Sequence, residues 1–461
     1  MANYAHTTKL QFRNKVYQKL GKSSSVYWPS AEIDSLLQQA LLNFGAISGF
    51  WKEEVIVDAR EEFIIYDLFP FSGNLTPVLG AQFIAPTLSS QTLFDWINQD
   101  LLETLDIFGQ ADSEFLSADG IMRTAESKYN LFQQLTALVI NSAELDSPAL
   151  QGIIDLPDSV IDLVRVSYKD DNGNWIVLDQ ADEEEVYQFM PKELNYSGVP
   201  KFYSYVYGNT KQLQLIPIPA NTSKIALMFV SAGLAPGFPD YPVNRIHLPN
   251  NLVPYLKFGV LADIFSNDGV WNDPIRAAYC KQRWEEGIVI AKQYNSVYTA
   301  KVNGRQISVD SLSNLDIYAS NPPSPGIYAP TILGFAGFNM FVINVSPQGN
   351  EFSFTLLVNA NAPFPIKDAD FIHIDQEYVD MLADYVVHLA QMKTGAAELG
   401  ATVAYKDEFL KTAVNHNRRL AQRGITFQSL SDNSKFQDRD DQRTLDNIQA
   451  QAASTQAQQG Y

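Results

Sequence analysis

The chain has 461 residues, enough for two or three domains with buried cores. Its net charge of −19 at pH 7 argues against a basic nucleic-acid cleft, because phosphate binding needs clustered lysine and arginine. An acidic surface stays compatible with a channel through which DNA slides, because carboxylates repel phosphate. The lone cysteine, Cys280, excludes an intrachain disulfide and is expected to be a small buried residue.

Residues 1–150 are predicted to form a mainly helical region. Apolar residues at helical spacing lead up to Gly21, which favours a helix end. Ser30 is predicted to cap a second helix with an apolar stripe. A Thr-x-x-Asp sequence that starts at Thr92 resembles the capping box of a third helix, and a fourth is expected at 121–139.

Residues 151–245 are predicted to form an antiparallel β region. The stretch LVRVSYKDDNGNWIVLD alternates around Asp-Asn-Gly-Asn, and KFYSYVYGNTKQLQLIPIP turns at Gly208-Asn209. Both patterns indicate hairpins. A further strand is expected in KIALMFVSAG.

Residues 246–296 and 372–430 are predicted to be two related helix pairs. Ile246-His247 falls on Ile372-His373, 126 positions later (373 − 247), and Val253 falls on Val379. The apolar positions 253, 256, 260 and 264 recur as 379, 382, 386 and 390, which is one face of a helix. Paired antiparallel helices favour a packing scaffold over a catalytic pocket.

Residues 297–371 return to strand, with a hairpin predicted in FNMFVINVSPQGNEFSFTLLV. Residues 431–461 are polar and Gln-rich, and they are predicted to be a flexible tail or an arm that orders on a partner. We expect no membrane contact. The first twenty residues lack the apolar core of a signal peptide, and prolines and glycines interrupt the longest weakly charged stretch, YAPTILGFAGFNMFVINV.

The predicted fold class is therefore α+β: a helical bundle of N-terminal helices and two helix pairs, with inserted antiparallel β segments and a C-terminal tail.

Two short motifs resemble ligand-binding loops. Gly21-Lys22-Ser23 resembles the end of a phosphate-binding loop, but the required earlier glycine is Val16, so we favour a helix end. Asp170, Asn172 and Asn174 have calcium-loop spacing, but Trp175 replaces the required glycine, so we favour a hairpin turn.

His373 and Asp375, with Asp368 and Asp370 nearby, are candidate metal ligands. A metal needs three or four converging donors. We favour a helix entry, with Asp375 as the cap. The other histidines, His6, His247, His388 and His416, belong to no catalytic motif.

The alternating residues Tyr203, Tyr205 and Tyr207 share one strand face, and Phe202 precedes them. They offer a stacking platform for sugar or single-stranded nucleic acid, or they pack on a neighbouring strand, which we favour. We predict no catalytic, cofactor-binding or metal-binding residues and no cofactor.

The segment 155–230 followed by the first helix pair resembles the head–tail adaptor, or neck connector, proteins of tailed bacteriophages. The likeness is carried by GVPKFYSYVYGNTKQLQLIPIP, by LPNNLVPYLKFGVLADIF and by the opening WPSAEIDSLLQQALLNFGAISGFW. It covers roughly 20–295, while residues 297–422 add a further β segment and helix pair.

The resemblance implies a structural virion protein without enzymatic activity. Such a protein forms a homo-oligomeric ring, commonly a dodecamer, contacts a portal protein and a tail or nozzle protein, and lines a DNA passage without reading sequence. The implied location is the virion, assembled in the host cytoplasm. Other hypotheses are a tail nozzle, portal-like or spike protein, a glycan-binding module, and a glycoside hydrolase with paired carboxylates.

Overall fold

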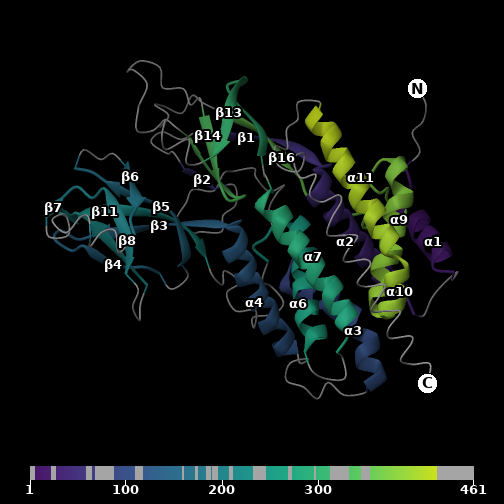
Figure 1. Ribbon diagram of the computed structural model, residues 1–461. Helices are drawn as coiled ribbons and strands as arrows, with labels where there is room; N and C mark the ends of the chain where they lie inside the picture. Colours follow the sequence, from purple (N-terminus) through teal and green to yellow (C-terminus); the bar gives the residue numbers. More distant parts are fainter. Residues whose placement is uncertain are drawn as a thin grey trace.

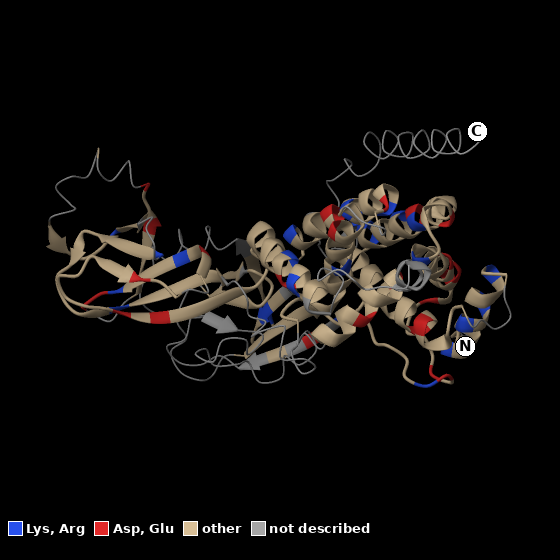
Figure 2. Cartoon of the chain, turned by 90° about the horizontal axis from the view of Figure 1, so that it is seen from below, with Lys and Arg blue, Asp and Glu red and all other residues tan. Residues whose placement is uncertain are grey.

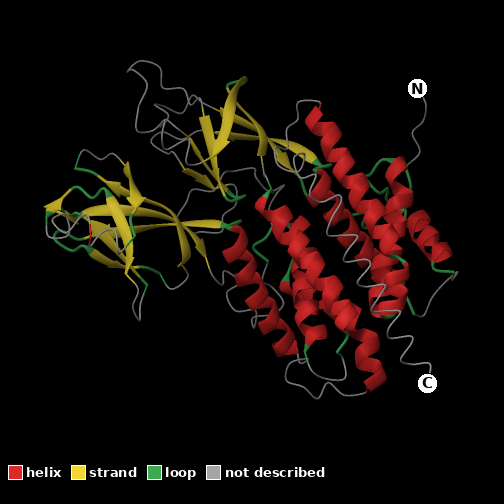
Figure 3. Cartoon of the chain, viewed as in Figure 1, coloured by secondary structure: helices red, strands yellow, loops and turns green. Residues whose placement is uncertain are grey.

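The computed structural model places helices on one side of the molecule and strands on the other (Figures 1 and 3). The chain is a mixed α+β protein. The structure describes residues 6–21, 27–58, 65–67, 88–108, 118–157, 160–171, 175–182, 188, 196–206, 211–231, 246–267, 272–294, 297–311, 332–343 and 353–422.

The N-terminal helices pack against the C-terminal ones. Helices α1 (Lys9–Lys19) and α2 (Ser30–Ser48) lie beside α9 (Val379–Ala390), α10 (Ala396–Ala401) and α11 (Val403–Gln422) (Figure 1). In sequence, more than three hundred residues separate α2 from its partners, so this group needs both ends of the chain.

The middle of the chain supplies a second helix group. Helices α3 (Ser90–Phe108) and α4 (Ala118–Thr136) pack on α6 (Val253–Ser266), which packs on α7 (Pro274–Lys292). In helix α6 only Asp263 and Ser266 are not buried, which goes beyond the single buried face that we predicted.

Helices α6 and α7 run antiparallel, as predicted, and two glycines let them approach closely. A Cβ atom on Gly259 would lie 2.5 Å from Cε3 of Trp284, and one on Gly287 would lie 2.4 Å from Cβ of Tyr255. The space that a side chain would need is therefore filled by the aromatic ring of the facing helix.

The two predicted helix pairs begin alike. A 3₁₀ turn at Asn250–Leu252 leads into α6, and a 3₁₀ turn at Gln376–Tyr378 leads into α9. The two turns are 126 positions apart (376 − 250), the offset found in the sequence. The pairs then diverge, because a 3₁₀ turn at Gln391–Lys393 and α10 stand between α9 and α11.

One seven-stranded sheet has the order β1-β16-β12-β13-β14-β15-β2. Its strands are β1 (Lys52–Asp58), β2 (Ile65–Asp67), β12 (Val297–Val302), β13 (Arg305–Ser311), β14 (Ile332–Ala336), β15 (Met340–Ile343) and β16 (Ser353–Asn359). Strands from residues 52–67 therefore form both edges of a sheet whose interior comes from residues 297–359.

The hairpin predicted across FNMFVINVSPQGNEFSFTLLV is wrong. Strand β15 pairs with β14 and β2, while β16 pairs with β1 and β12. The turn before β15 contains Gly337 at φ 61°, which permits a tighter hairpin with β14. Alternation alone could not choose between these partners.

A second seven-stranded sheet has the order β3-β11-β5-β6-β8-β9-β4, and a short pair joins β10 to β7. The bounds are β3 (Ile140–Ser147), β4 (Ile153–Asp155), β5 (Val160–Lys169), β6 (Trp175–Gln180), β7 (Ser197–Gly198), β8 (Phe202–Val206), β9 (Gln212–Ile216), β10 (Ile218–Pro219) and β11 (Ser223–Ser231). The predicted β5–β6 and β8–β9 pairings and the strand at β11 are confirmed.

The two sheets meet at a small apolar cluster and a polar joint. The cluster contains Ile140, Met228, Val230, Met340 and Val342. Beside it, the buried amide of Asn339 accepts a hydrogen bond from the Ile140 N–H at 3.0 Å and donates to the Ile140 carbonyl at 2.8 Å. We call this contact the sheet joint.

Several local predictions need correction. Residues 1–150, which we predicted to be mainly helical, also contain strands β1, β2 and β3. Ser30 is the first helical residue and Pro29 takes the cap position, without a side-chain hydrogen bond. Ser89, not Thr92, caps α3, because its hydroxyl accepts the Thr92 N–H at 3.2 Å.

The domain boundaries at 150, 245, 296, 371 and 430 stay predictions. The segment 431–461 lies outside the described residues.

Candidate functional site

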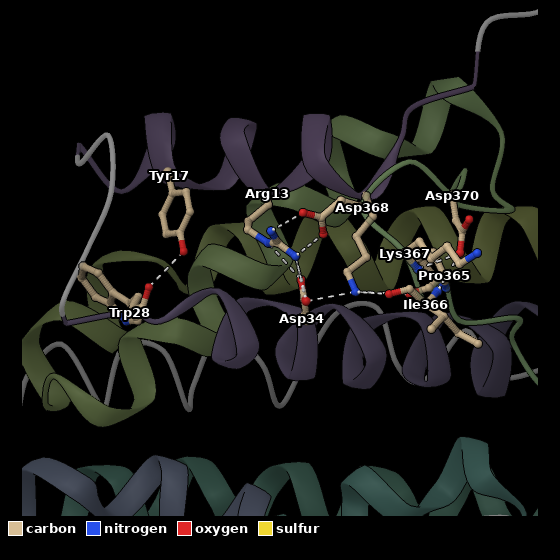
Figure 4. A network of polar contacts seen from close by, with 10 residues as sticks. Arg13, Tyr17, Trp28, Asp34, Pro365, Ile366, Lys367, Asp368 and Asp370 are labelled. Atoms are coloured by element: carbon tan, nitrogen blue, oxygen red, sulfur yellow. Dashed lines mark hydrogen bonds and ion pairs between the residues drawn. The ribbon is translucent and has the colours of Figure 1, made fainter.

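Helix α1 is held by acidic side chains from other parts of the chain (Figure 4). Arg13 donates to the Asp34 carboxylate through Nε at 3.1 Å and through Nη2 at 2.8 Å. Nη2 also lies 3.0 Å from Oδ1 of Asp368. Paired charge-assisted bonds of this kind have a defined geometry. Arg13 therefore joins α1 both to α2 and to the segment that precedes α9.

The start of α1 is fastened by backbone as well as side chain. The buried Nζ of Lys9 lies 3.0 Å from Oδ2 of Asp34. The Lys9 N–H donates to the Asp370 carbonyl at 2.9 Å, and the Ile372 N–H donates to the Thr7 carbonyl at 3.0 Å. This short strand-like contact sets the position of α1 along the 365–372 segment.

Further along α1, Lys15 pairs with Asp380 and Lys19 pairs with Asp384, both on α9. The hydrogen bond from Lys15 lowers the pKa of Asp380. Helix α1 contains no acidic residue of its own. We call its receiving surface the α1 cradle, defined by segment 365–372 and four acidic residues: Asp34, Asp368, Asp380 and Asp384.

A buried ion pair within the second helix group also contacts the first group through Gln39. Nζ of Lys257 on α6 lies 2.7 Å from Oδ2 of Asp100 on α3, with 1% and 4% of these side chains exposed. Lys257 also donates to the side-chain oxygen of Gln39 on α2 at 2.7 Å. Burial raises the pKa of Asp100, and the Lys257 charge opposes this rise. Each charge is stabilised by the other, because neither side chain contacts water.

Arg283 is a fully buried cation on α7. It pairs with Glu286, and its Nη2 donates to the Tyr385 hydroxyl at 3.1 Å. The same hydroxyl accepts from Nδ2 of Asn43 at 3.0 Å. This network therefore connects α7, α9 and α2 through hydrogen bonds that replace lost water.

His388 is buried between polar partners from other helices. Its Nε2 lies 2.7 Å from the Tyr279 hydroxyl, and its Nδ1 lies 2.9 Å from the Thr402 hydroxyl. Burial, together with the charges of Lys406 and Arg283, lowers the pKa of His388 to about 3. The imidazole is therefore neutral near pH 7, and its contacts are those of a structural group.

Where the structure describes the phosphate-loop and calcium-loop motifs, they lie at a helix end and at a hairpin, the alternatives that we favoured. Gly21 follows the end of α1 with φ 73°, as a helix end requires. Lys22, Ser23, Asn172 and Asn174 lie outside the described residues. Asp170 follows β5, which pairs with β6 as a hairpin.

The four candidate metal ligands do not converge on one point. Asp368 is engaged by Arg13, and Oδ2 of Asp370 accepts the Lys367 N–H at 2.7 Å. His373 is exposed, and Asp375 occupies the cap position of the 3₁₀ turn, as predicted, but its side chain makes no capping hydrogen bond. Among the described residues, no group of three His, Cys, Asp or Glu side chains could hold a metal ion.

The remaining histidines lie apart. His6 is exposed beside Phe371, with ring centroids 6.0 Å apart. Burial lowers the pKa of His247 to about 4. Nδ1 of His416 lies 3.0 Å from the Tyr378 hydroxyl, which joins α11 to the turn before α9.

The tyrosine strand packs inward where it is described. Tyr203 is buried in the core of its own sheet, and burial raises its pKa to about 12. The hydroxyl of Tyr205 accepts the Leu163 N–H at 2.7 Å. Tyr207 lies outside the described residues. Tyr203 and Tyr205 therefore serve strand packing, the alternative that we favoured.

Cys280 is fully buried on α7, and burial raises the pKa of its thiol. This confirms the expectation of a small buried residue.

Sequence reasoning missed the buried charges. Lys257 is the only cation in the mostly apolar helix VPYLKFGVLADIFS. A single cation among apolar residues is a sequence signal for a buried ion pair. The acids that pair with α1 gave no comparable signal, because three of them are more than three hundred residues away.

Figure 2 shows acidic and basic residues interspersed over the helices and over the sheet that extends away from them. Within the described part of the chain, no helix is both long enough and apolar enough to cross a membrane. Comparison with protein-family models and with curated proteins finds no match for this chain.

Proposed function

We propose that this protein is a structural component of a bacteriophage virion. It would be a head–tail connector that forms a homo-oligomeric ring between portal and tail and lines the DNA passage. Its fold would be a helical bundle, built from the N-terminal helices and two helix pairs, from which antiparallel β segments project. The work of such a protein is geometric: it matches one ring to another.

The observation that carries the proposal is the common start of the two helix pairs. Each pair begins with a 3₁₀ turn at the equivalent position, and each follows a β segment. A repeated helix-plus-strand unit supports a scaffold role, since helices can pack side by side while strands reach the next component.

The described polar clusters support the same proposal. The ion pair of Lys257, the hydrogen bond from Arg283 to Tyr385 and the contacts of His388 connect helices to one another. Each of these groups is buried among protein partners, which suits a rigid subunit. The net charge of −19 suits a wall along which DNA must slide.

The test is assembly with a portal. The purified protein is mixed with the portal protein of its phage, and its mass is measured by light scattering alone and in the mixture. We expect a ring of many copies that binds the portal at one face. A monomer that joins neither itself nor the portal would contradict the proposal.

Electron microscopy of intact particles separates the connector from other virion components. Density for this chain between portal and tail supports the connector. Density at the distal tail tip or at the portal position itself would support a nozzle, a spike or a portal-like protein.

A further inference from the structure

The docking of α1 resembles the docking of a separate ligand. Every cation of the helix pairs with an acid outside it, through Lys9, Arg13, Lys15 and Lys19. Because α1 has no acids and the cradle supplies them, the two surfaces are complementary in charge.

Apolar contacts complete the fit. Phe12, Val16 and Tyr17 are buried under α1, and the Tyr17 hydroxyl donates to the Trp28 carbonyl at 3.1 Å. Nearly all of this contact is made by side chains and by the Thr7–Lys9 backbone. Any other copy of the cradle offers the same partners.

The outer ion pairs of the contact are open to solvent, whereas the side chains of Lys9 and Arg13, which pair with Asp34, are only 7% and 11% exposed. Asp380 is 70% exposed and Asp368 is 56% exposed. Exposed ion pairs are each weak and are screened by salt. Phe12 and Val16 belong to the main core, so a cradle that loses its own helix needs α1 of another copy to cover that core.

The connection between α1 and α2 is long for neighbouring helices. Residues 20–29 join α1 to α2, and neighbouring helices are commonly joined by two to eight residues. Ten residues can span up to about 33 Å. To reach a cradle beside its own over this length, the chain must also release Tyr27, whose carbonyl accepts a hydrogen bond from Lys393, and Trp28, whose indole donates to the Ala390 carbonyl.

We propose that α1 exchanges between copies of this chain, so that the helix of one copy docks in the α1 cradle of the next. The partner is a second copy, and the contacts are those that the helix makes here. Successive exchange around a closed set of copies would link each subunit to its neighbour. The proposal needs only self-association and stands whether or not the protein binds a portal.

Charge reversal tests the exchange. One variant, K15E/K19E, reverses the helix; a second, D380K/D384K, reverses the cradle; a third carries all four changes in one chain. K224E, which breaks the exposed Lys224–Glu144 pair in the projecting sheet, is the matched control. Circular dichroism checks that each variant is folded, and self-association is measured by light scattering.

We expect each reversed variant alone to associate on the order of tenfold more weakly. Mixing the first two variants should restore a complex, and an affinity tag on one should retain the other. The four-change chain and K224E should associate like the unmodified chain. Recovery in the four-change chain without recovery in the mixture would mean that α1 docks only within its own copy.

Cross-linking of the unmodified chain is a second measurement that needs no variant. Equal amounts of ¹⁴N- and ¹⁵N-labelled protein are mixed, and a carbodiimide joins Lys15 to Asp380 or Lys19 to Asp384. Peptide pairs of mixed isotope support exchange, while same-isotope pairs alone overturn it. Mixed pairs from a protein that never binds a portal would uphold the exchange and contradict the proposed function.

Discussion

At the scale of single residues, the α6–α7 contact depends on two glycines. Gly287→Ala places a methyl group where Tyr255 already lies, and we expect it to lower the free energy of unfolding by roughly 1–3 kcal/mol. Gly400→Ala in α10 meets nothing within 4 Å and should be neutral or slightly stabilising. Urea denaturation measures both. Equal loss in the two variants would contradict close packing at Gly287.

Buried His388 makes stability depend on pH. Its pKa is about 3 in the folded chain and 6.5 when exposed, so the unfolded chain binds more protons between these values. Stability is therefore complete above about pH 6.5 and falls as the pH drops, by at most ~1.4 kcal/mol per pH unit for this group.

Denaturation at pH 5 and at pH 7 tests this dependence on His388. H388Q should unfold more easily at pH 7, because polar partners are left unpaired, but it should lose less stability between the two pH values. H6Q removes an exposed imidazole and should behave like the unmodified chain. An unchanged pH dependence in H388Q would contradict the assignment.

At the scale of elements, the sheet joint fixes one sheet on the other. Asn339→Ala leaves the buried N–H and carbonyl of Ile140 without partners, which should cost about 1–3 kcal/mol. Proteolysis should then cut the connections between the sheets faster than it cuts the helices. Asn14→Ala, at an exposed position on α1, is the control. Unchanged cleavage in N339A would mean that apolar contacts alone hold the joint.

Local patterns predicted elements well and partners less well. The helix pairs, the β5–β6 hairpin and the β8–β9 hairpin follow from periodicity and turn residues close to one another in sequence. The pairing of β16 with β1 could not be predicted, because the two strands are far apart in sequence and neither contains a residue pattern that specifies the other. The cations of α1 can be read from the sequence, but their acidic partners are brought to them only by tertiary packing.

At the scale of the whole molecule, the acidic balance predicts weak contact with DNA. With a net charge of −19, the chain should not retard duplex DNA in a gel at physiological salt, even at micromolar concentration. A known basic DNA-binding protein serves as the control. Tight binding under these conditions would contradict a wall along which DNA slides and would favour a nucleic-acid-binding role.

The long-range closure of the fold also has a consequence in time. The indole of Trp51 donates to the carbonyl of His373 at 2.9 Å, across 322 residues of chain. At typical speeds of synthesis, a ribosome needs roughly 15–65 s to travel that distance. During that interval the first helices have been made while their partners have not, so α1 and α2 gain their contacts with α9 and α11 only after residue 373 has been added.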